Sequence, residues 1–382
     1  MSALETLIMI PGPTHVPPRV LAAMARPMIG HRTDEYSEMH LRCEDRLKQI
    51  FRTENRILIF AATGTGGMEA AVVNTLSPGD KVLAVNCGNF GQRFGEIARR
   101  FGAEVDELVY APGTAADPDD IASKLDADGE IKAVLATFNE TSTGVTNDMA
   151  GIGAAVKEHD ALLIVDGISG MAAIECHSDK WGLDVVVAGS QKAFMLPPGL
   201  AFVSVSEAAW TAAEQSSLPK FYWDFKAMGT RAEEGQTAYT SAVSMMFALD
   251  EALAIIAEEG IDGFAARHVR MAAAVRAAVG ALGLRLLADP AHLSNTVTAV
   301  RGDGFDPDAM RTVMRDKYNV LLSGGQKELK GKIFRIGHMG AVAEREVLTT
   351  ISCLEAALCD VGVAITRGAG VAAAMEALAA SS

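Results

Sequence analysis

Two short apolar segments each lead into a side chain that could do chemistry. Leu162–Val165 ends at Asp166, and Val185–Ala188 is followed closely by Lys192. Uninterrupted runs of branched apolar residues are typical of parallel strands that are buried on both faces. Because ligands of open α/β sheets bind outside the carboxyl ends of the strands, we expect the Asp166 carboxylate and the Lys192 amine to face one cleft.

A carboxylate and a primary amine in one dry cleft suit pyridoxal phosphate. The amine can form a Schiff base with the cofactor aldehyde, and the carboxylate keeps the pyridine nitrogen protonated so that the ring accepts electrons. The alternative is an ordinary surface lysine and an aspartate that opens a turn. Asp166 and Lys192 by themselves favour that alternative, so further residues have to decide.

A glycine-rich turn earlier in the chain could bind a phosphate. The segment 61–80, AATGTGGMEAAVVNTLSPGD, follows the apolar run Ile57–Phe60 and leads into a helix that we expect to start near Gly67 and to end before Pro78. Unpaired N–H groups at a helix start favour anions, and Thr65 adds a hydroxyl. The turn matches neither GxGxxG nor a Walker loop, and many such turns serve packing only.

Three further residues follow expected strands and could line the same cleft. Phe90, in NCGNFGQR, could stack on a flat ring or plug the core. Thr141, in NETSTG, could bond a ligand or cap its own loop. Arg335, in KIFRIGHMG, presents a planar fork that suits a carboxylate, although it could equally pair with a local acid.

The elements that must position these residues alternate between strand and helix patterns. This alternation predicts an α/β fold with a mainly parallel sheet covered by helices on both faces. Further strands are expected at Val82–Val85, Val105–Val109, Ala133–Phe138, Leu200–Val205, Val297–Val300, Val320–Leu322 and Lys332–Ile336. Helical patterns cover Val20–Phe51, Gln92–Phe101, Pro118–Leu125, Met149–His159, Thr237–Glu258, Phe264–Leu282, Ala343–Leu358 and 366–382, whereas Phe221–Glu234 is expected to be irregular.

The length of 382 residues exceeds the usual size of one core, so we expect a large domain and a smaller one. Prolines at 11, 13, 17 and 18 predict an extended N-terminal arm over residues 1–18. The change of character after Gly260 places the large domain at 19–260 and the small C-terminal domain at 261–382.

Composition limits the classes of function. A formal net charge of −14 argues against a nucleic-acid or anionic-membrane surface. An apolar fraction of 49% with only 6% aromatic residues fits a helix-rich α/β protein. The five cysteines show no C-x-x-C spacing, so we expect no metal site, reduced thiols and a cytoplasmic location.

Taken together, the motifs resemble those of the class V aminotransferases of fold type I, in particular the alanine/serine–glyoxylate (serine–pyruvate) group. The resemblance runs over nearly the whole chain. It rests on PGP-x-x-x-PP, the glycine turn with MEAAVVN, GNFGQR, NETSTGV, VDGISG, GSQKAFMLPPGL, T-x-x-T before a long helix, and FRIG. Relatives often carry Trp at the position of Phe90, His or Thr at Gly67 and Tyr at Thr237, and these departures bear on substrate and cofactor affinity.

The resemblance implies a role for each candidate residue. Lys192 would be the Schiff-base lysine, Asp166 the partner of the pyridinium and Phe90 the stacking ring. The phosphate would be held by Thr65, Gly66, Gly67 and Gln191, joined by Thr237 and Thr240 from the other subunit of a homodimer. Thr141 would reach the cofactor ring or the substrate, Arg335 would clamp the substrate carboxylate, and Gly12 would lie at the substrate.

The activity implied is ping-pong transamination, from a small amino acid, alanine or serine first, to glyoxylate or pyruvate. Aspartate and ureidoglycine remain alternative donors. A lyase or desulfurase on the same fold would need a mobile loop cysteine, whereas Cys353 and Cys359 fall on a helical pattern. A non-catalytic, cofactor-binding subunit of a larger complex is a further possibility, against which the set of Lys192, Asp166 and Arg335 argues.

Overall fold

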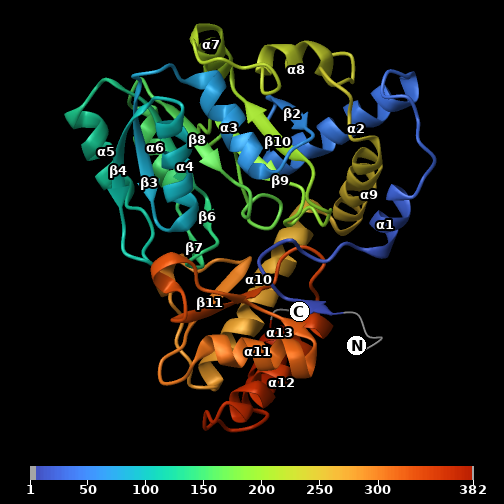
Figure 1. The fold of residues 1–382 in the computed structure, drawn as a ribbon, viewed down its shortest axis with the longest axis vertical. Coiled ribbons are helices and arrows are strands. Elements are labelled where there is room, and N and C mark those ends of the chain that lie inside the picture. Colours follow the sequence, from blue (N-terminus) through green and yellow to red (C-terminus); the bar gives the residue numbers. More distant parts are fainter. Residues whose placement is uncertain (1–5, 381–382) are drawn as a thin grey trace.

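A seven-stranded sheet forms the centre of the larger part of the molecule, shown at the top of Figure 1. The computed structural model describes residues 6–380. The strand order is β2-β10-β9-β8-β5-β3-β4, and only β10 runs antiparallel to its neighbours, which confirms the predicted mainly parallel sheet. The strands are β2 (Arg56–Phe60), β3 (Lys81–Asn86), β4 (Glu104–Val109), β5 (Ile131–Thr137), β8 (Leu162–Asp166), β9 (Val185–Gly189) and β10 (Ala201–Val205).

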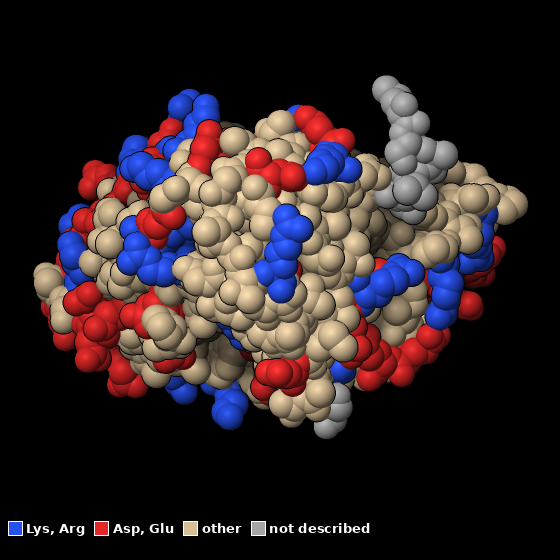
Figure 2. Space-filling view, turned by 90° about the horizontal axis from the view of Figure 1, so that it is seen from below, with Lys and Arg blue, Asp and Glu red and all other residues tan. Residues whose placement is uncertain are grey.

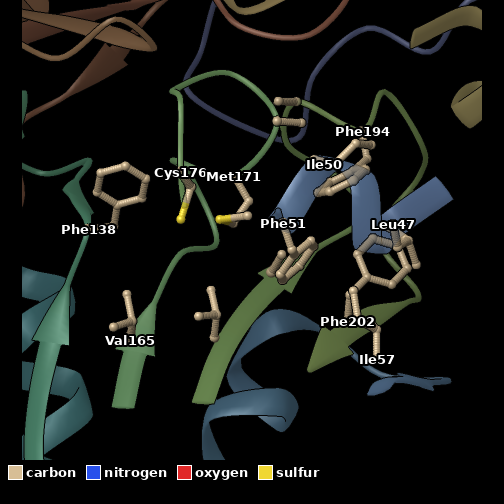
Figure 3. Close-up of a cluster of buried hydrophobic side chains, with 14 of the residues drawn as sticks. Leu47, Ile50, Phe51, Ile57, Phe138, Val165, Met171, Cys176, Phe194 and Phe202 are labelled. Atoms are coloured by element: carbon tan, nitrogen blue, oxygen red, sulfur yellow. The ribbon is translucent and has the colours of Figure 1, made fainter. Parts of the chain in front are cut away.

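Helices cover both faces of this sheet, so its central strands are buried throughout. The helices are α1 (Pro18–Met24), α2 (Asp34–Phe51), α3 (Gly64–Thr75), α4 (Asn89–Arg100), α5 (Pro118–Ala127), α6 (Met149–Lys157), α7 (Glu207–Gln215), α8 (Phe225–Ala232) and α9 (Val243–Glu259). On one face, Leu47 and Phe51 of α2 pack with Phe202 of β10 and Phe194 (Figure 3). On the opposite face of the sheet, the alternate residues of each strand pack against α3 and α4.

Several helix boundaries differ from the predicted ones. The helical pattern over Val20–Phe51 is broken between α1 and α2, where Pro27 lacks an N–H and Thr33 caps the new helix by accepting a hydrogen bond from Tyr36 N. The segment 221–234, expected to be irregular, contains α8, whose N-cap Asp224 accepts bonds from two backbone N–H groups. Hydrophobic periodicity predicts where helices lie better than it predicts where they begin and end, because each end depends on a single capping residue and its hydrogen bonds.

A smaller part lies below the sheet in Figure 1 and has its own core. It contains α10 (Ile261–Ala281), β11 (Val297–Arg301), α11 (Pro307–Tyr318), β12 (Val320–Leu321), β13 (Ser323–Gly324), β14 (Ile333–Gly337), α12 (Glu344–Asp360) and α13 (Ala369–Ala380). Two short strands, β6 (Asn139–Glu140) and β7 (Val145–Thr146), form a hairpin that follows β5 in the chain, while β11, β14 and β13 form an antiparallel sheet.

The N-terminal arm attaches first to this smaller part. Strand β1 (Leu7–Ile8) pairs with β12, and Met9 is fully buried in the small core. The helix α10 joins the two parts, because Phe264 packs in a core of the large part and Met271 in that of the small part. The predicted boundaries after residues 18 and 260 stay predictions, and residues 1–5 of the arm lie outside the described residues.

No helix within residues 6–380 is long and apolar enough to cross a membrane. Seen from the end of the molecule that Figure 2 faces, acidic and basic side chains are interspersed around a largely uncharged centre. The residues of interest lie between the two parts, at the carboxyl ends of β5, β8 and β9.

Candidate active site

The structure brings Lys192 and Asp166 together in buried positions beyond the ends of the neighbouring parallel strands β8 and β9. Lys192 is 9% exposed, and burial, assisted by the positive charges of Arg335 and Arg93, lowers the pKa of its amine to about 8 against the attraction of Asp166. Burial raises the pKa of Asp166 to about 6. Among the described residues, its carboxylate accepts one hydrogen bond, from Ile168 N to Oδ1 at 2.9 Å.

The N-terminal arm forms the wall beside the lysine. Lys192 Nζ donates a hydrogen bond to the Pro11 carbonyl at 2.7 Å, and Thr14 Oγ1 donates to the Lys192 carbonyl at 2.9 Å. Gly12 has a φ of +131°, and a Cβ there would lie 2.7 Å from Lys192 Nζ. Only glycine therefore leaves room for the amine at this point. The prolines predict an extended arm here, but the sequence did not show that this arm contacts Lys192.

The glycine-rich turn starts its helix three residues earlier than predicted. Helix α3 begins at Gly64, and Gly67 N–H makes a backbone hydrogen bond to Thr63 O at 3.2 Å. The N–H groups of Gly64, Thr65 and Gly66 precede the helical ladder and are the ones available to an anion. A Cβ on Gly67 would lie 2.7 Å from Val187 Cγ1, so this glycine fits the close packing of α3 on β9.

Gln191 contributes a buried polar atom to the same region. Its Oε1 has no hydrogen-bond partner within residues 6–380. A Cβ built on Gly189 would lie 3.1 Å from this oxygen and 3.3 Å from Ile168 Cγ2, and Ile168 in turn borders Gly64. The side-chain amide of Gln191 thus lies between the lysine loop and the start of α3, and it needs a polar partner that the chain does not supply.

Phe90, Thr141 and Arg335 come from three different elements. Phe90 lies in the first turn of α4, with the Arg93 guanidinium 4.9 Å from its ring centroid. Thr141 Oγ1 shares a 2.7 Å hydrogen bond with Ser169 Oγ. Arg335 donates from Nη1 to the Thr141 carbonyl at 2.8 Å, although 194 residues separate the two.

Arg335 is not paired with an acid. The side chain is 4% exposed, and its second hydrogen bond runs from Nε to the Gly324 carbonyl at 3.0 Å. It forms no salt bridge within the described residues, and burial lowers the pKa of its guanidinium to about 10. Of the two roles that the sequence left open for Arg335, a direct salt bridge to a local acid is not formed within the described residues, although the buried Glu140 carboxylate attracts the guanidinium.

A groove of about 480 Å³ opens beside Arg335 in the small part. Its lining includes Ile10, Gly324, Arg311 and Lys330. Arg311 is partly neutralised by a 2.7 Å salt bridge to Asp308. Three cations and one carboxylate give the groove a positive excess in a chain whose formal net charge is −14.

Thr237 and Thr240 line a cavity whose lining does not include Lys192. They precede α9, which begins at Val243 and not at Thr237 as predicted. Both line a small cavity with Phe60 and Ala61 at the end of β2. Thr237 Oγ1 donates to the Tyr239 carbonyl at 2.6 Å, whereas Thr240 is exposed.

One residue of the NETSTG loop, Glu140, was missed by the sequence reasoning. Glu140 is fully buried and Ser142 is nearly so. They accept hydrogen bonds from the first N–H groups of α4. The available signal was an acidic residue directly after a buried strand, where a carboxylate needs several donors.

A buried amine and a buried carboxylate at the carboxyl ends of parallel strands, next to an open helix N-terminus, are the arrangement expected in an enzyme of fold type I. The chain belongs to the class V aminotransferases, because the profile of the family described as Aminotransferase class-V matches residues 9–340. It is accordingly an enzyme that transfers an amino group between small amino acids and oxo acids.

Individual relatives cover the chain almost from end to end. It is 43% identical over 378 residues to the "Soluble hydrogenase, small subunit" of Synechococcus sp. (strain PCC 6716), covering 98% of each chain. It is 40% identical to the L-aspartate--glyoxylate aminotransferase of Paracoccus denitrificans, with 97% of this chain and 95% of that one covered. The crystal structure of ureidoglycine-glyoxylate aminotransferase from Bacillus subtilis superposes with a TM-score of 0.93 at 31% identity, covering 99% of both chains.

The family implies pyridoxal phosphate, and the residues present fit that group. The open N–H groups of Gly64, Thr65 and Gly66 offer hydrogen-bond donors for a phosphate, and the NH2 group of the Gln191 side chain is a further donor, whereas its unpaired Oε1 can only accept. Asp166 keeps Oδ2 for a pyridine N–H, since only Oδ1 accepts a bond from the chain.

Proposed function

We propose that this aminotransferase binds pyridoxal phosphate at Lys192 and moves an amino group from alanine or serine to glyoxylate or pyruvate. The observation that carries the proposal is the buried Lys192 amine, whose pKa is lowered to about 8, in one cleft with the Asp166 carboxylate. A lysine with this pKa has a much larger neutral, nucleophilic fraction near neutral pH than an ordinary lysine, and it can both take up and release a proton there.

Each residue has a distinct task in this proposal. The N–H groups of Gly64, Thr65 and Gly66 and the Thr65 hydroxyl bind the phosphate, and Gln191 adds its amide. Gly67 is assigned to packing α3 on β9, because its N–H is already used by Thr63 O.

The remaining tasks concern the ring and the proton. Phe90 stacks on the ring, Thr141 borders it, and Asp166 holds a proton at the pyridine nitrogen. When bound, the cofactor supplies an electron-accepting ring. Lys192 would take the proton from the substrate α-carbon and pass it to the cofactor carbon, and would carry it in the opposite direction in the reverse half-reaction, with Pro11 O as the acceptor that holds its free amine.

The substrate carboxylate is proposed to bind Arg335. Its Nη1 and Nε donate to two carbonyls, which fixes the direction of the guanidinium, and it forms no salt bridge within the described residues. Gly12 lies against Lys192, where any larger residue would meet the lysine side chain.

A homodimer with shared sites is proposed as the working unit. Phe221 is 77% exposed, and Tyr222 stacks on Tyr239 with ring centroids 5.3 Å apart, next to the exposed Thr240. Large aromatic groups gathered at a surface favour a protein interface. Thr237 and Thr240 would then reach the phosphate of the partner. All five cysteines have free thiols, which supports the proposed cytoplasmic location.

Borohydride trapping tests the function. The purified protein, saturated with pyridoxal phosphate and reduced, should carry the cofactor on the peptide that contains Lys192. Lys192→Ala should abolish both the label and the transfer activity. Lys180→Ala, an exposed lysine ahead of β9, serves as the matched control and should change neither. A label on any other lysine would refute the assignment.

Aspartate is a second candidate donor, favoured by Arg311. This guanidinium lines the same groove as Arg335, and residue 324 lies between the two: Arg335 Nε bonds its carbonyl, and a Cβ on Gly324 would lie 2.5 Å from Arg311 Nη1. A second carboxylate on the substrate could therefore meet a second cation. Arg311→Gln should lower kcat/KM for aspartate and leave alanine and serine unchanged; equal effects on all donors would remove this candidate.

A desulfurase and a non-catalytic subunit find less support in the structure. Cys353 and Cys359 lie on α12 in the small part and not on a loop, whereas a desulfurase needs a mobile cysteine at the amine. A non-catalytic subunit is raised by the name of the Synechococcus relative. The complete set of Lys192, Asp166 and Arg335 supports turnover by this chain instead, and multiple turnovers by the purified protein would decide the matter.

A further inference from the structure

Helix α4, which carries Phe90, is capped by a distant part of the chain. Its own N-cap residue, Gly88, has no side chain, and no local cap is made. Instead, Phe90 N and Gly91 N both donate to Glu140 Oε2 at 3.0 Å, and Asn89 N donates to Ser142 Oγ at 2.9 Å. The first turn of α4 is therefore held by the loop that follows β5.

Glu140 is fully buried, and four hydrogen bonds compensate its charge. Its second oxygen, Oε1, accepts from Ser142 N at 3.0 Å and from Ser142 Oγ at 2.5 Å. The positive end of α4 adds a favourable interaction with a carboxylate at this place. The space is closely filled, because a Cβ on Gly88 would lie 2.8 Å from Glu140 Cδ.

One carboxylate thus joins two walls of the cleft. On one side it fixes the backbone N–H of Phe90. On the other it fixes the loop whose next residue, Thr141, accepts the Arg335 hydrogen bond and shares one with Ser169. The distance between the aromatic ring and the Thr141 loop depends on the two oxygens of Glu140.

We propose that Glu140 is a positioning residue of the cofactor site, which holds the Phe90 ring at its stacking distance and orientation. This inference rests on the proposed function, since it concerns how the chain receives pyridoxal phosphate. Glu140 touches neither Lys192 nor Asp166 by a hydrogen bond in the described residues, and it acts through Phe90 and Thr141.

The test is Glu140→Gln. The carboxamide has one oxygen and one NH2 group, so whichever way it is turned, an NH2 faces a backbone N–H donor on one of the two sides. Misplacing an aromatic contact should weaken the binding of pyridoxal phosphate to the apoprotein roughly three- to tenfold. The visible circular dichroism of the bound cofactor, which reports its orientation, should change as well.

Glu355→Gln is the matched control. Glu355 is also a buried carboxylate that caps a helix from a distance, accepting from Gly370 N at 2.8 Å and from Val371 N at 3.1 Å at the start of α13, within the small part. Both variants should lose similar amounts of unfolding stability. Only Glu140→Gln should alter cofactor affinity and circular dichroism.

A double-mutant cycle with Phe90→Ala separates positioning from mere support of the fold. If Glu140 acts through Phe90, the double variant should bind the cofactor little more weakly than Phe90→Ala by itself. Fully additive losses, or a Glu140→Gln protein that matches Glu355→Gln in every readout, would overturn the inference. Should Glu140→Gln fail to fold, Ser142→Ala, which removes the acceptor for Asn89 N, takes its place with the same expected direction.

The outcome is independent of the test of the function. If the wild-type protein takes up no pyridoxal phosphate at Lys192, the proposed function fails. If the wild type binds it and Glu140→Gln binds it equally well with an unchanged spectrum, only the role of Glu140 fails.

Discussion

Replacing Arg335 should weaken the substrate in both half-reactions while the cofactor stays bound. The guanidinium is buried, carries no ion pair within the described residues and is aimed by two carbonyls, so a substrate carboxylate is its natural counter-charge. A hydrogen bond to a charged group contributes about 1.5–3 kcal/mol. At about 1.4 kcal/mol per decade, Arg335→Ala should lower kcat/KM by roughly ten- to a hundredfold for both the amino donor and the oxo acceptor.

Arg335 also contributes to the stability of the fold, and this contribution must be measured separately from its effect on activity. Its removal leaves the buried Thr141 carbonyl without its 2.8 Å donor, and an unsatisfied buried group costs about 1–3 kcal/mol of folding free energy. Arg335→Lys keeps the charge but loses the planar guanidinium that binds a carboxylate through two donors. Compared with Arg335→Ala, we expect it to restore stability more fully than activity. Arg301→Ala, at the exposed end of the adjacent β11, is the control and should leave both nearly unchanged.

The assay combines half-reaction kinetics with urea unfolding. Absorbance of the bound cofactor reports each half-reaction, and the unfolding midpoint reports stability. If Arg335→Ala releases the cofactor, or destabilises the fold while the saturation constants for both substrates stay at wild-type values, the residue is structural and the carboxylate must bind elsewhere.

Three further predictions concern the lysine, the aspartate and the dimer. The rate at which the apoprotein captures pyridoxal phosphate should rise with pH through about 8, because burial lowers the pKa of Lys192 and only the neutral amine attacks; a midpoint near 10.5 would contradict this. Burial raises the pKa of Asp166 to about 6, so the carboxyl group holds its proton more tightly in the folded apoprotein than in the unfolded chain. The free energy of unfolding therefore falls as pH rises from 3.8 to 6. Asp166→Asn apoprotein should therefore exceed the wild type in unfolding free energy by up to about 3 kcal/mol above pH 6 and match it below pH 4, and identical pH profiles in urea titrations would refute the linkage. Mixing inactive Lys192→Ala chains with an inactive Thr240→Ala variant should restore activity through hybrid dimers, and silence despite proven subunit exchange would exclude shared sites.

Much of the catalytic layout was predictable because it depends on local order. The bounded apolar runs before Asp166 and Lys192 indicated buried parallel strands, and the geometry of an open sheet brings their ends together. Phe90 and Thr141 likewise follow β3 and β5 in the chain. The start of α3 was not predictable to the residue, because the preference between Gly64 and Gly67 depends on the contact of Gly67 with Val187 across the sheet.

The sequence by itself determined the alternation of strands and helices, the mainly parallel sheet and the placement of Asp166 and Lys192 at one edge of it, since periodicity and apolar runs act over a few residues. The tertiary structure decided which distant groups surround them. The Pro11 carbonyl meets Lys192 across 181 residues, and Arg335 meets Thr141 across 194. Such contacts arise only when buried polar groups must find partners in the packed chain, and no local pattern encodes the choice.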